Sequence, residues 1–365
     1  MTFGLAVIGG GPAGCAAAIM AARSGARVLV LERGRFPRHK VCGEFVSAES
    51  LDLLCTLLGE DSQTLFKNAP LIPQARIFMD GKTLIGSISP PAATITRFAL
   101  DHALWMACRT NGVEAHSETT AQKINGRSPF RITTNAETFE ADAVINAAGR
   151  WSNFTSAETR SRLNGAKWIG LKGHFHEAAP LPSVDLYFFD GGYCGVTPVR
   201  MAENGSGNVV NACAMVRADV ARTMADVFSK HPALLQRSSA WSAATDPVST
   251  SPLVFHVPEP LQNPMLQVGD AASFVDPFVG DGISLALRSG VLAAECLLPY
   301  FRKQCSLDQA SARFALEYKR QLSHVFRASS RLRGFLQWPE VVRRPVLSLF
   351  ARSSFVTNRI VKMTR

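Results

Sequence analysis

The chain has 365 residues, of which 47% are hydrophobic, and carries a formal net charge of +10. This length can bury a substantial core and suits one large domain or two interleaved ones. No apolar run reaches about 18 residues, so we expect no membrane-spanning segment.

The eight cysteines include no C-x-x-C pair. We therefore expect no zinc or other metal site, no redox-active dithiol and no disulfide framework. An apolar run begins almost directly at the N-terminus, which leaves no room for a signal peptide. These features predict a cytoplasmic protein.

The first motif is a glycine-rich loop between a predicted strand and a predicted helix. Residues 5–8 are an apolar run too short for a helix, and residues 13–24 are rich in alanine. The loop between them satisfies G-x-G-x-x-G, whose glycines allow a tight turn, close approach to a pyrophosphate, and close helix–strand packing. The helix N-terminus would face the anion. The expected contacts are Gly9, Gly11, Pro12, Ala13 and Gly14.

An acidic residue stands where such a unit needs one. Residues 27–31 form the next predicted strand, and Glu32 at its end lies 23 residues after Gly9. The expected spacing to the acid that binds ribose hydroxyls is about 20 residues. A carboxylate here disfavours a 2′-phosphate, and the adjacent Arg33 joins the candidate cofactor contacts.

The middle of the chain predicts two kinds of structure. A helix should begin near Arg97, and short strands are expected near 129–134 and 137–140. Residues 143–148 read as a further strand that ends in small residues before Gly149, suited to touch a cofactor. From about 165 to 260 the pattern is β-rich and predicts the sheet of a second domain.

A second glycine-rich segment follows the strand predicted at 265–268. Its Asp270 can accept hydrogen bonds from a ribityl chain, and a helix is predicted over 284–298. A helix N-terminus at this loop would stabilise the anionic end of a reduced flavin. The two glycine-rich loops together predict one long phosphate-bearing cofactor that is held at both ends. This arrangement favours a flavin. The contacts expected here are Asp270, Gly280, Asp281, Gly282 and Ile283.

From residue 1 to about 300, the chain resembles the flavoprotein superfamily of para-hydroxybenzoate hydroxylase, the flavin-dependent halogenases and geranylgeranyl reductase. The matching pieces are Gly9–Gly14 with Glu32, Arg97 to Asp101, Ala148–Ser152 and Gly269–Gly282. The resemblance is nearest to the geranylgeranyl-reductase-like branch, through Lys40–Glu44, Gly192–Pro198 and the acid between Gly280 and Gly282. It implies FAD, with Cys42, Gly43, Arg97 and Gly149 among its contacts.

The resemblance also implies a fold class and a division into domains. The expected fold is α/β: a Rossmann-like FAD-binding domain of the glutathione-reductase type, interleaved with a β-sheet substrate domain and followed by a helical C-terminus. The expected bounds are 1–165 for the first part of the FAD domain (with inserted substrate-domain elements at about 60–95), 166–262 for the substrate domain, 263–300 for the second FAD part, and 301–365 for the basic helical region.

Some residues depart from the family patterns. Ser273 stands where the aromatic hydroxylases often have histidine, and Phe45 replaces a serine of the halogenases. The halogenase Trp-x-Trp-x-Ile-Pro segment is absent. Lys67 and Lys82 are the nearby candidates for a halogenase lysine, and each reads better as a surface residue.

The predicted activity is an FAD-dependent oxidation or reduction of an apolar or aromatic small molecule. A NAD(P)H-dependent hydroxylase is the first expectation and a C=C reductase the second; a halogenase and an electron-relay flavoprotein are more distant. The candidate catalytic residues are Cys42, beside three basic residues, and Tyr193. With no second dinucleotide loop visible, a nicotinamide would bind only transiently. The expected pocket lining is Phe175, Tyr187, Phe188, Phe189, Tyr193 and Phe278.

The charge is concentrated at the C-terminus. Residues 301–365 hold 14 lysines and arginines against 3 acidic residues, whereas the rest holds 25 against 26. The plainer interpretation is a solvated face of amphipathic helices. The sharper one is peripheral docking to an anionic membrane or an acidic carrier protein through the basic residues. No module for binding nucleic acid organises this charge. The basic residues concerned are Arg331, Arg333, Arg343, Arg344, Arg352, Arg359 and Lys362.

Overall fold

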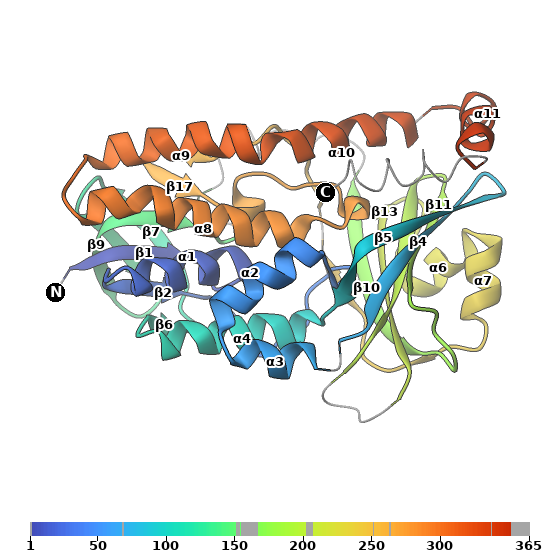
Figure 1. Ribbon diagram of the computed structural model, residues 1–365, viewed down its shortest axis with the longest axis horizontal. Coiled ribbons are helices and arrows are strands. Elements are labelled where there is room, and N and C mark those ends of the chain that lie inside the picture. The colour runs from blue at the N-terminus through green and yellow to red at the C-terminus, as the bar shows by residue number, and fades with distance from the viewer. Residues whose placement is uncertain are drawn as a thin grey trace.

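The computed structural model describes residues 2–67, 69–150, 154, 167–201, 207–250, 252–262, 264–336 and 338–351, with only the backbone for 346–351. The predicted residues Trp151, Ser152, Arg352, Arg359 and Lys362 lie outside these ranges. Two sheets lie side by side, and long C-terminal helices run along one side of them (Figure 1). The expected α/β class is confirmed. The domain bounds stay a prediction.

The first sheet contains the parallel core of the fold. Its strand order is β16-β17-β9-β1-β2-β6, with β7 and β8 attached at β9. Strands β1 and β2 are almost wholly buried, as expected for parallel strands covered on both faces. Its strands are β1 (Phe3–Ile8), β2 (Val28–Leu31), β6 (Glu114–His116), β7 (Ala121–Gly126), β8 (Phe130–Thr134), β9 (Thr138–Asn146), β16 (Leu261–Gln262) and β17 (Met265–Gln267).

Strand β9 corrects one expectation. The runs at 137–140 and 143–148 are not separate strands, because Thr138–Asn146 is continuous. Its first half alternates in burial and pairs antiparallel with β8, whereas its last four residues are all buried and pair parallel with β1. The strand therefore pairs with β8 along its first half and with β1 from Ala141 onward. Only its end reaches the edge where β1 also ends.

The second sheet has nine strands in the order β14-β10-β13-β12-β11-β4-β5-β3, with β15 beside β10. The hairpin β4–β5 joins it by parallel pairing of β4 with β11, although more than 100 residues separate them in sequence. The strands are β3 (Phe45–Val46), β4 (Leu71–Met79), β5 (Lys82–Thr94), β10 (Trp168–His176), β11 (Ser183–Phe189), β12 (Gly192–Val199), β13 (Val209–Arg217), β14 (Ser242–Ala243) and β15 (Val248–Thr250).

The helices divide between the two sheets. In Figure 1, α8 lies between α1 and α9, and α10 continues from α9 toward the second sheet, while α6 and α7 lie at the far side of that sheet. The helices are α1 (Pro12–Arg23), α2 (Ala48–Leu58), α3 (Asp61–Phe66), α4 (Arg97–Thr110), α6 (Met224–Ser229), α7 (Pro232–Ser238), α8 (Gly282–Phe301), α9 (Leu307–Gln321), α10 (Ser323–Leu336) and α11 (Glu340–Ala351).

Helix α8 packs closely against α1. A Cβ at Gly290 of α8 would collide with the backbone carbonyl oxygen of Ala13 in α1. Within the described ranges, α8 is the one helix long and apolar enough to cross a membrane, and 61% of its most apolar stretch is buried in the protein. Its contacts with α1 and α9 account for that apolar composition.

Substituting Gly290 tests this contact. Gly290→Ala should lower the free energy of unfolding by about 1–3 kcal/mol, because the added methyl group meets backbone that cannot move aside. The matched control is Gly334→Ala in α10, where an added Cβ meets no atom. That variant should be neutral or more stable by up to about 1 kcal/mol. Urea unfolding measures both, and equal effects would contradict the close contact.

Candidate functional site

A cavity of about 1030 Å³ collects the predicted site residues. Both glycine-rich loops, the segment 40–44, the second sheet and α10 contribute to its wall. The predicted residues that line it are Gly9, Gly11, Pro12, Ala13, Glu32, Arg33, Cys42, Gly43, Arg97, Gly149, Tyr193, Asp270, Gly280, Asp281, Gly282 and Ile283. Gly14 does not line it. Its Cβ would collide with the carbonyl oxygen of Gly9, so this glycine permits helix–strand packing instead.

The first loop presents a bare helix N-terminus to the cavity. Gly9 has a φ of +111°, and a Cβ there would collide with the backbone at Ala147. Helix α1 begins at Pro12 after Gly11, with no side-chain cap on its first N–H groups. A Cβ at Gly11 would meet no atom within 4 Å, so the backbone faces open space. Unsatisfied N–H groups and a positive dipole end suit an anion here.

Glu32 is held as a carboxylate at the end of β2. Its Oε2 accepts a hydrogen bond from the Gly10 N–H at 2.9 Å, and its Oε1 accepts from Arg38 at 2.6 Å and from the Gly34 N–H at 2.8 Å. Burial acts to raise its pKa, but the Arg38 guanidinium and the two N–H donors outweigh burial and lower it. An ionised acid therefore stands where ribose hydroxyls would need an acceptor.

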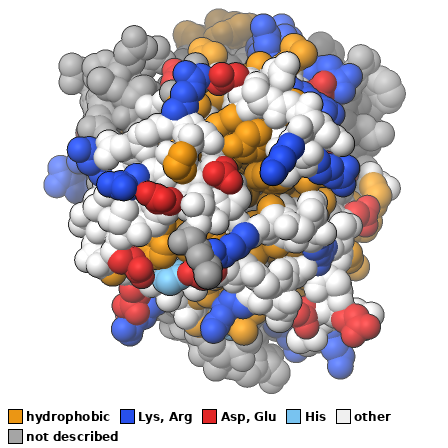
Figure 2. Space-filling view, turned by 90° about the vertical axis from the view of Figure 1, so that its left-hand side faces the viewer, with side chains coloured by type: hydrophobic (Ala, Val, Ile, Leu, Met, Phe, Trp, Pro, Cys, Tyr) orange, Lys and Arg blue, Asp and Glu red, His pale blue; other side chains and the backbone are white. Residues whose placement is uncertain are grey.

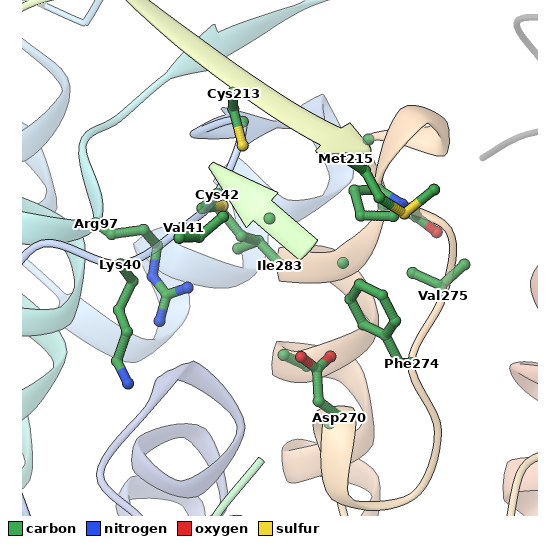
Figure 3. Close-up of a pocket in the computed structure, with 18 of the residues that line it drawn as sticks. Lys40, Val41, Cys42, Arg97, Cys213, Met215, Asp270, Phe274, Val275 and Ile283 are labelled. Carbon is green, nitrogen blue, oxygen red and sulfur yellow. The ribbon is translucent and has the colours of Figure 1, made fainter. Parts of the chain in front are cut away.

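Cations gather beside this loop. Arg97 binds Asp101 through two hydrogen bonds of 2.6 and 2.7 Å; the pair raises the pKa of Arg97 despite its burial. Burial, followed by repulsion from Arg38 and Arg97, lowers the pKa of Lys40 to about 8. A nearby anion would stabilise the charged form of a buried lysine whose pKa is lowered in this way. In Figure 3, Lys40 and Arg97 lie on one side of the pocket, across from Asp270 and Phe274.

The second sheet anchors the segment 40–44. Three side chains from β10, β12 and β13 donate to its backbone carbonyl groups: Lys172 to Lys40 at 3.2 Å, Asn211 to Cys42 at 3.0 Å, and Thr197 to Gly43 at 3.3 Å. The Cys42 Sγ accepts a hydrogen bond from the N–H of Glu44 at 3.3 Å. The position of Cys42 therefore depends on the second sheet.

A buried ionic group lies at the end of this segment. Glu44 is fully buried, forms an ion pair with Lys172, accepts from His174 Nε2 at 2.8 Å, and accepts from the N–H of Arg97 at 2.8 Å. Burial acts to raise the pKa of Glu44, but the charge of Lys172 and the bond from His174 lower it. The sequence reasoning missed Lys172 and His174. The sequence signal for them was a run of polar residues at alternate positions, Lys172, His174 and His176, on one face of a strand whose other face is apolar.

The second loop also lines the cavity and lies against the first, with Gly269 beside Ala13. Asp270 lies in the short helix η2 (Gly269–Ala271), 3.6 Å from Arg150, whose guanidinium lies over the Phe274 ring. Gly280 adopts a φ of +75° and packs against Phe45. Helix α8 starts at Gly282, and the side chain of its N-cap residue makes no capping hydrogen bond. A second helix N-terminus therefore points its N–H groups at the cavity.

Three aromatic rings form a wall near this loop. Phe188, Tyr193 and Phe278 have ring centroids 5.5–6.0 Å apart. Burial, followed by the charge of Asp276, raises the pKa of Tyr193 well above its ordinary value, so its hydroxyl stays protonated at neutral pH.

Half of the expected aromatic lining faces elsewhere. Phe175 packs against Phe228 and Trp241, and Tyr187 stacks on Phe78, on the opposite face of the second sheet. Phe189 joins the same apolar cluster. The reason is the alternation of side chains along β10 and β11, which sends neighbouring residues to opposite faces.

Comparison with protein families identifies the enzyme family of this chain and its cofactor. Residues 48–294, more than half of the chain, match the family profile of FAD dependent oxidoreductases, and residues 4–59 match a second profile of the same description. The chain belongs to the FAD dependent oxidoreductase family. The predicted resemblance to flavoproteins is confirmed. The chain belongs to a family of enzymes that use FAD as their cofactor.

Curated relatives of this oxidoreductase carry several activities. It is 24% identical to conditioned medium factor receptor 1 of Dictyostelium discoideum, over 99% of this chain and 76% of that protein. It is 25% identical to digeranylgeranylglycerophospholipid reductase 2 of Methanopyrus kandleri, over 89% and 83%. It is 24% identical to tryptophan 2-halogenase of Chondromyces crocatus, over 84% of this chain and 62% of the halogenase.

Solved structures share the fold. The flavin-dependent brominase Bmp2 matches with a TM-score of 0.77 at 17% identity, over 100% of this chain and 93% of that one. A geranylgeranyl bacteriochlorophyll reductase-like protein of Thermoplasma acidophilum matches with a TM-score of 0.76 at 19% identity, over 100% and 95%. Reductases and halogenases therefore share this architecture, and the reaction depends on the residues of the site.

The geometry of the cavity fits FAD. Gly11, Gly43 and Gly149 all line the cavity, and a Cβ at any of the three would meet no atom within 4 Å, which leaves room for a ligand against the backbone. The first helix N-terminus, with Lys40, suits the pyrophosphate, and Glu32 suits the adenosine ribose. Asp270 and the N-terminus of α8 would hold the ribityl and ring end.

The pH dependence of FAD binding tests the role of Lys40. Its charged form should be favoured by the diphosphate, so FAD affinity should fall as the pH rises from about 7 to 9, through its pKa of about 8. Lys40→Met should weaken binding about tenfold at neutral pH and remove that pH dependence. The exposed Lys67→Met is the control. Flavin fluorescence titration measures each affinity, and an unchanged pH profile in Lys40→Met would contradict this role.

A double-mutant cycle tests the pair of Glu44 and Lys172. Lys172→Met should cost about 3–5 kcal/mol of stability, since it leaves a buried carboxylate without its cation. Glu44→Gln/Lys172→Met should cost clearly less than the two single changes added together. Since the pKa of Glu44 is lowered by folding, its contribution is present above its ordinary value of 4.5 and disappears as the pH falls through the folded pKa. Urea unfolding of all four proteins measures the coupling, and strict additivity would argue against it.

Proposed function

We propose that this oxidoreductase adds hydrogen across a C=C bond of a long apolar molecule, using FAD with a nicotinamide as the external reductant. The observation that carries the proposal is an apolar extension of the cavity, here called the apolar branch. Its lining residues are Ala75, Ile77, Met79, Leu84, Ile88, Val184, Leu186, Phe188, Ala328, Arg331, Leu332, Phe335 and Leu336. Of these described residues, Arg331 alone is charged.

The apolar branch is continuous with the aromatic wall at the flavin end. Phe188 touches both Tyr193 and Phe278, and it also packs with Met79 and Leu84. Phe335 and Leu336 of α10 contact the same pair from the opposite side. An apolar chain held there would place one of its bonds beside the second loop. Burial of apolar surface supplies the binding energy and requires no specific polar partner.

Alkene reduction needs a hydride for one carbon and a proton for the other. Bound FAD supplies the hydride chemistry, and the protein must supply the proton and exclude water. Tyr193 is buried, lines the cavity and carries its hydroxyl proton at neutral pH, and we assign it as the group that donates that proton. Cys42 lies on the other side, where the Glu44 N–H fixes its sulfur, and we assign it to orienting the ring or the substrate.

Halogenation and hydroxylation have weaker support. Lys67 and Lys82, the candidates for a halogenase lysine, are both exposed and do not line the cavity. A hydroxylase, the first expectation from the sequence, would use the same flavin site with oxygen. The apolar character of the branch favours a long apolar chain over a small phenol, and the similarity to digeranylgeranylglycerophospholipid reductase 2 points the same way.

The decisive measurement compares two products. The protein with FAD is reduced and mixed, without oxygen, with geranylgeraniol as a long alkene probe; mass spectrometry should show addition of one H₂. A parallel reaction with oxygen and a simple phenol should give no oxygenated product. If oxygen is transferred to the phenol and the alkene is not reduced without oxygen, the protein is a hydroxylase and the proposed reductase activity is wrong.

Variants measured in the same assay test the roles of individual residues. Tyr193→Phe should lower kcat about 100-fold with little change in KM, because only the proton is removed. Leu336→Trp should raise KM for the long probe by filling the apolar branch, whereas Leu316→Trp on the exposed face of α9 should have no effect. Full turnover in Cys42→Ala would remove Cys42 from the site's chemistry.

A further inference from the structure

The apolar branch ends beneath an unusual surface at the junction of α10 and α11. Arg331 lines the branch and is itself exposed, so the cavity reaches the surface beside it. Just beyond, Trp338, Val341 and Val342 have exposed fractions of 47%, 81% and 51%. Large apolar side chains this exposed, next to one another and beside a cavity mouth, mark a surface for contact rather than a solvated face.

The arginines near this junction fall into two groups. Arg333 and Arg343 are turned inward: Arg333 binds the buried Asp276 at 2.8 Å, and Arg343 makes two bonds of 2.7 Å to Asp80 of the β4–β5 hairpin. Arg333 and Arg343 are therefore not available to bind a partner, although the sequence analysis counted both among the basic residues of the C-terminal region. Arg327 and Arg331 lie one turn apart on the exposed side of α10, and the described part of the chain places no carboxylate in ion-pair range of either.

The junction is built into the fold. Besides its pair with Asp80, Arg343 donates to the carbonyl oxygen of Leu336 at 2.6 Å, which ties the start of α11 to the end of α10. The Trp338 ring lies against Phe335, 5.4 Å between centroids. These contacts hold Trp338 and the start of α11 against the end of α10. Between the apolar residues Trp338 and Val341, the exposed Glu340 lies 3.9 Å from Arg344. The face at the other end of the molecule also mixes basic and acidic side chains (Figure 2).

We propose that the described residues within 327–336 and 338–344 form a docking surface for an anionic lipid membrane. Trp338, Val341 and Val342 would enter the interface between headgroups and acyl chains, and Arg327 and Arg331 would bind anionic headgroups. This arrangement sets the mouth of the apolar branch against the bilayer, so an apolar substrate could move from lipid to the cavity without crossing water. The inference rests on the apolar-substrate part of the proposed function.

Vesicle binding of the FAD-loaded protein tests the surface directly. Vesicles of phosphatidylglycerol and phosphatidylcholine should bind it, vesicles of phosphatidylcholine alone should bind it weakly, and added salt should reduce binding to the anionic ones. Val341→Asp/Val342→Asp should lower binding at least about tenfold, and Arg327→Glu/Arg331→Glu should remove the preference for anionic lipid. Leu235→Asp on α7, whose exposed fraction of 51% matches that of Val342, and the exposed Arg222→Glu are the controls.

The outcomes separate this inference from the proposed reaction. Val341→Asp/Val342→Asp should keep its FAD content and its turnover of substrate dissolved in detergent micelles, which shows that the variant is folded. Failure of the native protein to bind anionic vesicles, or equal loss in the control variants, would overturn the docking surface and leave the reaction standing. Dimers in solution that dissociate in Val341→Asp/Val342→Asp would assign the surface to a second copy of the chain instead.

Discussion

The backbone contact between α1 and α8 is the constraint on which the site depends. Gly290 lets the two helices approach until α8 touches the carbonyl oxygen of Ala13, and Gly269 lies against the side chain of the same alanine. This contact brings the N-termini of both helices to one cavity, although the two loops are far apart in sequence. Two positive helix ends at one cavity favour an anionic, electron-accepting ligand that is long enough to reach both, and FAD has that shape and charge.

The second sheet completes the cofactor site as well as the substrate cavity. Its side chains hold the backbone of 40–44, and its Lys172 and His174 hold the buried Glu44, which in turn accepts from the N–H that begins α4. A buried carboxylate with three such partners fixes the geometry strongly, because losing any partner leaves an uncompensated polar group. The position of Cys42 beside the cofactor is therefore set by the strands that also enclose the substrate.

Sequence could predict what depends on local spacing. The glycines of both loops, the acid at Glu32 and the helix from Arg97 follow from turn chemistry and short-range periodicity, and the structure has these elements in place. It could not predict which face of β11 turns inward, because aromatic residues stand on both faces: Phe188 enters the cavity while Tyr187 does not. Nor could it pair Glu44 with Lys172, since their contact spans 128 residues and depends on the docking of two sheets.

Helix α10 contacts the apolar branch, the protein surface and the second loop. Its Leu332, Phe335 and Leu336 cover the apolar branch, its Arg327 and Arg331 are exposed, and its Arg333 reaches the buried Asp276 within the second loop. Burial raises the pKa of Asp276 to about 6, and the nearby Arg333 opposes that rise. A shift of α10 away from the sheet would thus open the branch and separate Arg333 from Asp276 at once. Because an unpaired buried carboxylate is costly, the ion pair between Arg333 and Asp276 stabilises the packing of α10 over the cavity.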